Sequence, residues 1–343
     1  MTNRSMQNDK SRPAIRIEGL EYEILEELSL PNRGRWKVRD PHPRPRGTIR
    51  TAIVLDDTPA SRQLERSLRC LPSSVNEIPQ LHVCGYHAGK KVWIVSWQKG
   101  ITIERYLEKV HEGRFLQRPS VWESVRRTKS LAYALRILAQ DCQIVHGDIK
   151  PSNLILPRNR GSVFLIDFGS SWQMERTNLR VLGDGVQAAY AAPEILMDRH
   201  TIDSRSDQFS AGVVLYEMLT MELPYCGLGG KAGLSSDQSD LEMDHKPPSQ
   251  LVVDSDRIPS SILAELDMVV GRLLQLDADR RYGTPTEFCQ AINALWHRLQ
   301  GAQDAIAKNP IPSNPSTTET RYDVRIPTAR MVMNVISKLL GGQ

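Results

Sequence analysis

The chain has 343 residues, of which 24% are charged and 40% are hydrophobic, the profile of an ordinary globular protein. The formal net charge is only +4, and basic residues do not gather with aromatic residues into a stripe, which argues against nucleic acid as a partner. The five cysteines are scattered, the N-terminus lacks an apolar signal segment, and no apolar run reaches the ~18 residues of a membrane span, so we expect a reduced, cytoplasmic protein.

Short runs of β-like composition dominate the first hundred residues. They are YEILEELSL at 22–30, RWKV at 35–38, TIRTAIVL at 48–55, LHVCGY at 81–86 and VWIVSW at 92–97. Turn-rich pieces separate these runs, and one helical stretch at 61–71 interrupts them. We predict a disordered N-terminus over residues 1–14 and a small lobe over residues 15–100, built as an antiparallel sheet that carries one helix.

The hydrophobic pattern changes to a helical period after residue 100. Leu131, Leu135 and Leu138 recur at i, i+4 and i+7, with Cys142 one turn further, which predicts a helix with one buried face. DQFSAGVVLYEMLT at 207–220 is apolar on all sides and predicts a buried helix, and two more helices are predicted near 261–276 and 285–299. These features predict a large, mainly helical lobe over residues 101–302, with 226–250 as a surface insertion, and an α+β class for the whole.

Residues 303–343 read as a Pro/Ser/Thr-rich linker followed by a short amphipathic helix. That helix would place Val332, Val335, Ile336, Leu339 and Leu340 on one face. Ten residues are too few to cross a bilayer, so the helix is expected to dock on its own lobe or to contact a partner or a membrane surface.

The segment HGDIKPSNLIL at 146–156 carries the strongest chemical signal. Asp148 and Asn153 lie in a predicted loop, and Asp167 follows fourteen residues after Asn153 at the end of another apolar run. Short oxygen-bearing side chains at strand ends can converge on Mg²⁺ and a phosphate chain, because Mg²⁺ prefers hard oxygen ligands. Phosphoryl transfer needs this arrangement, since its catalysis is mostly positioning and charge neutralisation.

With these motifs the sequence resembles the eukaryotic-like serine/threonine protein kinase family over residues 22–299. HGDIKPSN resembles the catalytic loop of that family, Asp167-Phe168-Gly169 its metal-binding loop, and Ala192-Pro193-Glu194 its A-P-E motif. Asp207 matches the aspartate that supports the catalytic loop, and Arg281 matches the arginine that pairs with the A-P-E glutamate.

The resemblance implies a two-lobed protein-kinase-like fold, in which residues 15–100 form the small nucleotide-binding lobe and residues 101–302 the large catalytic lobe. It also implies transfer of the γ-phosphate of ATP, with Mg²⁺, to serine or threonine hydroxyls of a protein substrate or of the protein itself. Asp148 would accept or orient the substrate hydroxyl proton, and Lys150 would neutralise the γ-phosphate. Asn153 and Asp167 would hold Mg²⁺. A lysine two residues after the catalytic aspartate is typical of serine/threonine kinases.

The small lobe departs from the family pattern at the nucleotide site. The glycine-rich turn is reduced to Gly34, and the strand TAIV places Val54 where the family has a phosphate-binding lysine. Two bases could substitute from nearby strand positions, Arg50 and Lys37. The best match for the helix glutamate that pairs with that lysine is Glu65, and Ser96 completes the expected nucleotide-binding residues.

Two further departures leave alternative functions open. Gly147 stands where many members have an arginine that receives an activating phosphate, and Gln187 stands at an expected threonine. A pseudokinase acting as a binding or scaffold module is one alternative, motivated by Val54. A small-molecule phosphotransferase is another, because H-G-D also opens the catalytic loop of that class, although Lys150 and the Glu194–Arg281 match favour a protein substrate.

Overall fold

The computed structural model describes residues 13–28, 34–42, 47–114, 117–158, 161–174, 187–197, 202–234 and 245–308. The chain divides into two compact units, Met1–Ala302 and Gln303–Gln343, and the account below concerns the first. The predicted disorder of residues 1–12, the middle of the predicted insertion at 235–244 and the predicted amphipathic helix near 332–340 lie outside the described residues.

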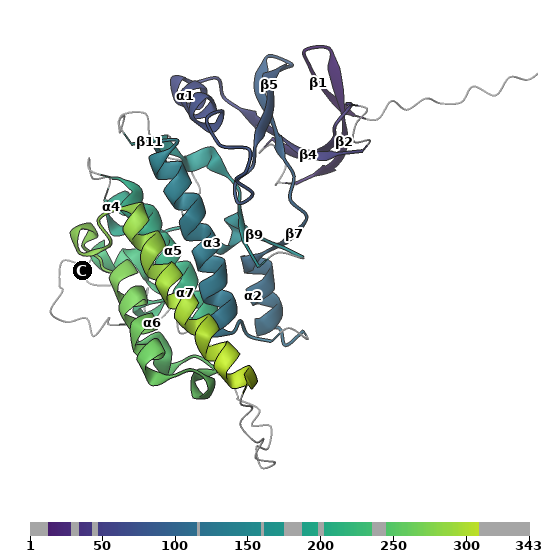
Figure 1. Cartoon of the computed structure of the whole chain (residues 1–343). Helices are drawn as coiled ribbons and strands as arrows, with labels where there is room; N and C mark the ends of the chain where they lie inside the picture. Colours follow the sequence, from purple (N-terminus) through teal and green to yellow (C-terminus); the bar gives the residue numbers. More distant parts are fainter. Residues whose placement is uncertain are drawn as a thin grey trace, which may run out of the picture. The chain divides into compact units, whose positions relative to one another are not determined.

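The small lobe is a six-stranded antiparallel sheet with one helix (Figure 1). Its strands are β1 (Ala14–Ile17), β2 (Leu20–Glu27), β3 (Arg35–Arg39), β4 (Ile49–Leu55), β5 (Leu81–His87) and β6 (Lys90–Ser96), in the spatial order β1-β2-β3-β4-β6-β5. Helix α1 (Pro59–Leu68) connects β4 to β5, and Thr58 caps it by accepting a hydrogen bond from the backbone N–H of Ser61.

Each face of this sheet packs into a different cluster. One face carries Tyr22, Val38 and Ile94, which are fully buried in a cluster confined to the small lobe. The other face carries Trp93 and Val95, which pack into the main core together with Leu68 of α1 and residues of the large lobe. Because side chains alternate along a strand, each residue's position in the register decides which cluster it joins.

The large lobe is mainly helical. Its helices are α2 (Ile103–His111), α3 (Val121–Gln140), α4 (Pro193–Leu196), α5 (Ser204–Thr220), α6 (Ser260–Leu273) and α7 (Pro285–Lys308). Short strands join them near the site: β7 (Gly100–Thr102), β8 (Ile144–Val145), β9 (Leu154–Pro157), β10 (Phe164–Leu165) and β11 (Trp172–Gln173). Helix α5 is buried over most of its surface, as its apolar sequence predicts, and the two-lobed α+β architecture is confirmed.

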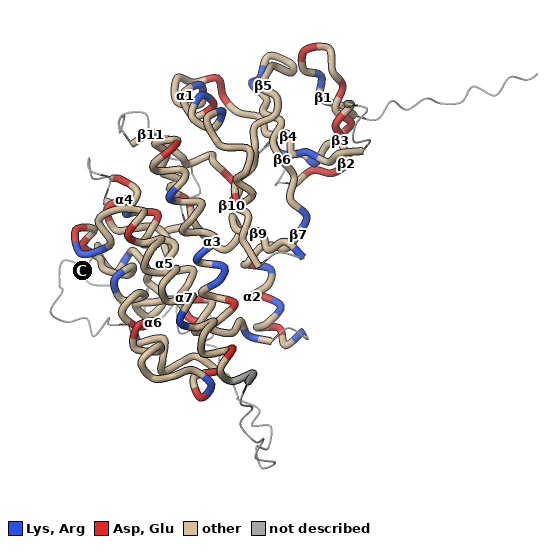
Figure 2. The backbone as a smooth tube through the Cα atoms, viewed as in Figure 1, with Lys and Arg blue, Asp and Glu red and all other residues tan. Residues whose placement is uncertain are grey.

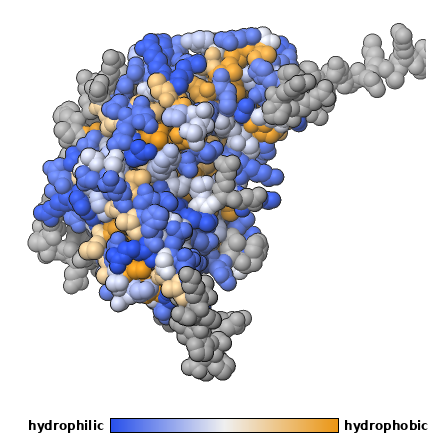
Figure 3. Space-filling model, viewed as in Figure 1, coloured by the Kyte–Doolittle hydropathy of each residue, from blue (hydrophilic) through white to orange (hydrophobic). Residues whose placement is uncertain are grey.

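The molecular face drawn in Figure 3 is mostly hydrophilic, with apolar residues in scattered groups. This agrees with a core that is closed inside the unit. In the described part of the chain, no helix combines the length and the apolar character that a bilayer span requires.

The structure differs from the sequence-based expectation at several boundaries. Strand β1 begins at Ala14, inside the segment predicted to be disordered, and helix α2 was not predicted. Helix α3 ends at Gln140, so Cys142 lies beyond it, although Cys142 is buried. Helix α7 continues to Lys308, past the predicted start of the linker at 303. Four-residue strands and nine-residue helices span too few periods to stand out in a sequence.

Candidate functional site

Asp207 fixes the backbone of the predicted catalytic loop. Its carboxylate accepts hydrogen bonds from the backbone N–H groups of His146 (2.7 Å) and Gly147 (2.8 Å). Burial raises the pKa of Asp207 to about 7, and the two N–H donors oppose that rise. Since Asp207 stands in the first turn of the buried helix α5, the loop is anchored to the rigid centre of the large lobe.

His146 ties the catalytic loop to the strand end that precedes Asp167. It is fully buried, its Nε2 lies 3.1 Å from the carbonyl oxygen of Ile166, and its ring packs edge-on against Phe168. A carbonyl can only accept, so Nε2 carries the proton, and Nδ1 accepts from the backbone N–H of Asp148. Burial lowers the pKa of His146 to about 4, so the ring is neutral near pH 7 and positions the loop.

The loop brings Asp148, Lys150 and Asn153 together. Asp148 Oδ2 lies 2.8 Å from Lys150 Nζ and accepts a hydrogen bond from Asn153 Nδ2 at 2.9 Å. Asn153 Nδ2 also donates to the backbone carbonyl of Asp148 at 2.8 Å, which leaves the side-chain oxygen of Asn153 for a cation. Burial raises the pKa of Asp148, and the charge of Lys150 opposes the rise, so the carboxylate is poised to take a proton while held in one orientation.

Asp167 lies at the end of the chain segment that follows β10. Its backbone is left-handed (φ 70°), and its Oδ1 accepts from the N–H of Gly169 at 3.1 Å and pairs with Arg35 Nη2. Burial would raise the pKa of Asp167, but the guanidinium of Arg35 outweighs it and holds that pKa below the ordinary range. Asp167 is therefore an anion and able to bind a cation.

The donor set fits a magnesium ion that shares its ligands with phosphate. Asn153 and Asp167 supply oxygen atoms, and the described residues hold no group of three His, Cys, Asp or Glu side chains that could bind a metal by themselves. Mg²⁺ in nucleotide sites is bound by one or two carboxylates together with substrate phosphates, so a small oxygen set is what such a site requires.

A cleft lies between the small lobe and these residues. Its wall is mostly apolar, with Ile53, Trp93 and Val95 from the sheet facing Phe164 and Ile166 from the large lobe. Ser96, Trp97 and Gln98 line the cleft where β6 ends, and Arg35 and Asp167 provide its charges. An apolar slot with charges at one end suits a flat base attached to phosphates.

Two of the nucleotide-site residues predicted from sequence, Val54 and Gly34, do not line the cleft. Val54 faces the small-lobe cluster, because the strand register places Ile53 toward the cleft, so the expected lysine position is Ile53. Gly34 packs against Val54, and its carbonyl accepts from the N–H of Val54 at 2.7 Å. A Cβ on Gly34 would lie 2.8 Å from Val54 Cβ, so the glycine serves this close approach between strands.

The two bases proposed as substitutes for the lysine are engaged outside the cleft. Arg50 Nε donates to Asp40 at 3.1 Å, and Lys37 Nζ pairs with Glu26 at 3.1 Å. Figure 2 shows basic and acidic residues side by side in this part of the sheet. Neither base lines the cleft.

The sequence analysis missed Arg35 and Lys91, two bases that lie near the places that the expected lysine would serve. Arg35 pairs with Asp167 in the cleft, and Lys91 Nζ on β6 lies 2.8 Å from Glu65 Oε2 on α1. Burial raises the pKa of the Glu65 carboxyl, but hydrogen bonds from Lys91, Cys84 and Arg69 together with the charge of Lys91 outweigh it and lower that pKa. The sequence does contain a signal for Lys91, because this lysine directly precedes the apolar run VWIV. A charged side chain beside such a run is buried only when it has a partner.

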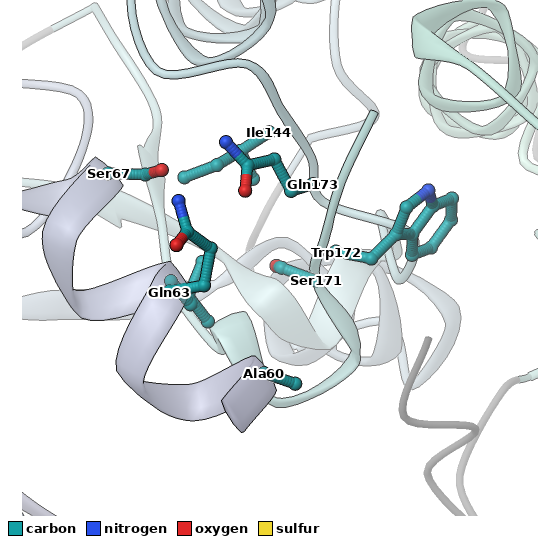
Figure 4. A pocket seen from close by; sticks show the side chains of 8 residues that line it. Ala60, Gln63, Ser67, Ile144, Ser171, Trp172 and Gln173 are labelled. Carbon is teal, nitrogen blue, oxygen red and sulfur yellow. The ribbon is translucent and has the colours of Figure 1, made fainter. Parts of the chain in front are cut away.

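Gly147 is explained by its contact with Trp172. Its φ is +76°, and a Cβ there would lie 2.0 Å from Cζ3 of the indole. Trp172 is 4% exposed and thus occupies the space that a side chain at position 147 would need. Figure 4 shows Trp172 pointing away from the small cavity between α1 and β11, where Gln63, Ser67 and Gln173 gather.

Replacing Gly147 with alanine is expected to lower the free energy of unfolding by about 2–5 kcal/mol, because left-handed backbone strain adds to overpacking against the indole. The measurement is urea denaturation. Gly89 is the matched control, because its φ is +78° and nothing lies within 4 Å of its added Cβ. Gly89→Ala should cost about 1–2 kcal/mol; equal costs for the two variants would contradict the role of Trp172.

The comparisons with known proteins agree with this geometry. A family model described as the protein kinase domain matches residues 101–296. The chain is similar to the serine/threonine-protein kinase PknJ of Mycobacterium tuberculosis, at 32% identity over 184 residues, which cover 50% of this chain and 30% of PknJ. It is also similar to a Streptomyces coelicolor protein named as a probable serine/threonine-protein kinase, at 30% identity over 67% of this chain and 33% of that protein. The chain thus spans about a third of the length of these curated relatives.

A solved structure shows the same fold. The crystal structure of the PknI kinase domain of Mycobacterium tuberculosis superposes with a TM-score of 0.56 at 21% identity, covering 82% of this chain and 98% of that domain. At this identity the likeness concerns the fold.

Proposed function

The chain belongs to the eukaryotic-like serine/threonine protein kinase family, and from that premise we propose that it transfers the γ-phosphate of ATP, with Mg²⁺, to serine or threonine hydroxyls of a protein substrate. The observation that carries the proposal is the convergence of Asp148, Lys150 and Asn153 within hydrogen-bonding distance of one another, in the loop that His146 ties to Asp167.

Each of these side chains has a distinct task in that reaction. Asp148, held by Lys150 and Asn153, accepts the proton of the attacking hydroxyl as the hydroxyl oxygen bonds to the γ-phosphorus and the bond from that phosphorus to ADP breaks. The positive charge of Lys150 stabilises the negative charge of the phosphoryl group during its transfer. Asn153 and Asp167 would hold Mg²⁺, which would supply positive charge to the phosphate oxygens.

A protein substrate is supported by the segment around the A-P-E motif. Glu194 is buried and joined to Arg281 by two hydrogen bonds of 2.6 and 3.0 Å. This pair fixes α4 against the large lobe directly after Ala191 and Ala192, which are both buried. A rigid platform at this place is needed to hold an extended peptide beside Asp148, and small-molecule phosphotransferases of the H-G-D class lack the motif.

A magnesium-dependent shift in thermal stability upon addition of ATP is the expected result for the whole chain. With ATP at about ten times its dissociation constant, binding adds about 1.4 kcal/mol of stability, or roughly 3 °C in melting temperature. Differential scanning fluorimetry with Mg²⁺, and with EDTA as the control, measures the shift. Transfer of labelled phosphate to the protein itself or to a general protein substrate, abolished by EDTA, tests the reaction.

A second candidate function is a binding module of the kinase fold without turnover. The observation that favours it is Ile53, an apolar side chain at the cleft position where the family has a lysine. A chain that shows no magnesium-dependent shift at millimolar ATP, and no transfer, would support this module and contradict the enzyme.

We also propose a cytoplasmic location. Its support is the state of the cysteines: Cys70, Cys84, Cys142, Cys226 and Cys289 are all free thiols. A reducing compartment preserves free thiols, two of which are exposed here. Separation of cell fractions followed by immunodetection tests the location, and recovery in the membrane fraction would contradict it.

A further inference from the structure

We propose that this chain divides the work of the kinase lysine between two residues: Arg35 on β3 binds the phosphates of ATP, and Lys91 on β6 holds α1 through Glu65. The inference rests on the proposed function for its ligand, and it concerns which residues of this chain recognise that ligand.

The cleft receives no positive charge from β4. Thr51 and Ile53 are the β4 residues that line it, and neither can neutralise a phosphate. Among the residues the structure describes, the cleft lining includes a single basic side chain, Arg35.

Arg35 stands directly across from Ile53. The register of β3 and β4 pairs these two residues, so their Cβ atoms are about 5 Å apart. The positive charge thus lies on β3, one strand away from the lysine position on β4 and at the same level along the cleft. An arginine side chain is long enough to cover that displacement, and its contact with Asp167 shows that it reaches the predicted metal-binding residue.

The environment of Arg35 differs from that of the other bases on its strand. Lys37 and Arg39 pair with Glu26 and Glu23, and none of these four side chains lines the cleft. Arg35 and Asp167 are only 28% and 22% exposed, and their charges meet inside the cleft. A guanidinium presents several N–H donors in a planar fork, so Arg35 can bind phosphate oxygens with donors that Asp167 does not use.

Lys91 takes the structural part of the lysine's role, which is to hold helix α1, and it does so outside the cleft. Its side chain is 4% exposed and contacts Glu65 at 2.8 Å and Asp57 at 3.6 Å, both at the α1 side of the sheet. Lys91 does not line the cleft, and it pairs in register with Leu55, two residues beyond Ile53. It therefore positions α1 against the sheet without contacting the nucleotide.

The test is the affinity of the whole chain for ATP with Mg²⁺, measured by isothermal titration calorimetry. Arg35→Met removes the charge and keeps the length of the side chain, and it is expected to weaken ATP binding about ten- to hundredfold. Adenosine, which has no phosphates, should bind the variant and the unchanged chain equally. Arg35→Lys should recover part of the loss.

Arg39→Met is the matched control, because Arg39 lies on the same face of β3 and outside the cleft, and it should change ATP affinity less than twofold. Melting temperatures of the ligand-free variants show whether the fold is kept. Equal or tighter ATP binding by Arg35→Met would overturn the proposal and would indicate that Arg35 obstructs cation binding by Asp167. A chain that binds ATP through Arg35 and transfers no phosphate would leave this inference standing and contradict the proposed reaction.

Discussion

Replacing Asp148 with asparagine is expected to reduce phosphoryl transfer by about a hundred- to ten-thousandfold, while ATP still binds. Asparagine keeps the shape of the side chain and cannot take the proton of the attacking hydroxyl. Asp148 is also the acceptor shared by Lys150 and Asn153, so the loss of its charge frees both groups from their orientation. The measurement is the rate of transfer of labelled phosphate at saturating ATP.

Asp141→Asn is the matched control for this experiment. Asp141 is an exposed carboxylate at the C-terminal end of α3, seven residues before Asp148, and its replacement should leave the rate unchanged. Calorimetry on Asp148→Asn should still detect ATP with Mg²⁺, because Asn153 and Asp167 remain. A transfer rate within a factor of three of the unchanged chain would exclude Asp148 as the group that accepts the proton.

Replacing Arg281 with methionine is expected to lower the free energy of unfolding by about 3–5 kcal/mol, because the variant leaves the buried carboxylate of Glu194 without its counter-charge. The Arg281 side chain is 0% exposed, and its Nε also donates to the carbonyl of Gln275 at 2.8 Å. The Glu194 carboxylate keeps one other hydrogen bond, from the hydroxyl of Ser206 at 2.7 Å, which does not offset a lost charge pair. Urea denaturation measures the effect.

Two further variants distinguish the effect of breaking the buried Glu194–Arg281 pair from the general effect of removing a basic residue. Arg280→Met changes an exposed neighbour whose contact with Asp277 is 3.8 Å, and it should cost less than about 0.5 kcal/mol. The double variant Glu194→Leu with Arg281→Met removes both charges and should be less destabilised than Arg281→Met alone. If the double variant were the less stable of the two, the penalty would come from lost packing and not from an unpaired charge.

The parts of the fold and of the site that depend on local sequence were predictable. Helix α5 could be predicted because its apolar character extends over several turns, and the catalytic loop because its residues lie within one short segment. Asp207 and Arg281 were placed through motifs that keep their spacing. The structure brings each of these side chains to the contact that its motif implied.

That Arg35 is the positively charged residue of the cleft could not be predicted in the same way, for a physical reason. Side chains alternate between the two faces of a sheet, so an error of one residue in the register assigns a side chain to the wrong face. This error placed Val54 at the lysine position, although Ile53 is the residue that faces the cleft. Arg35 reaches Asp167 over 132 positions of sequence, and Lys91 reaches Glu65 from a strand on the other side of β4. Both contacts join residues that are distant in the sequence, and no local pattern contains them.

The contact between Gly147 and Trp172 bears on how a cell can control this protein. The indole of Trp172 fills the space at position 147 where many members of the family have an arginine, so this position offers no cation for a phosphate. We expect that treatment of the purified chain with a phosphatase leaves its initial rate unchanged, whereas a phosphate-dependent enzyme would slow.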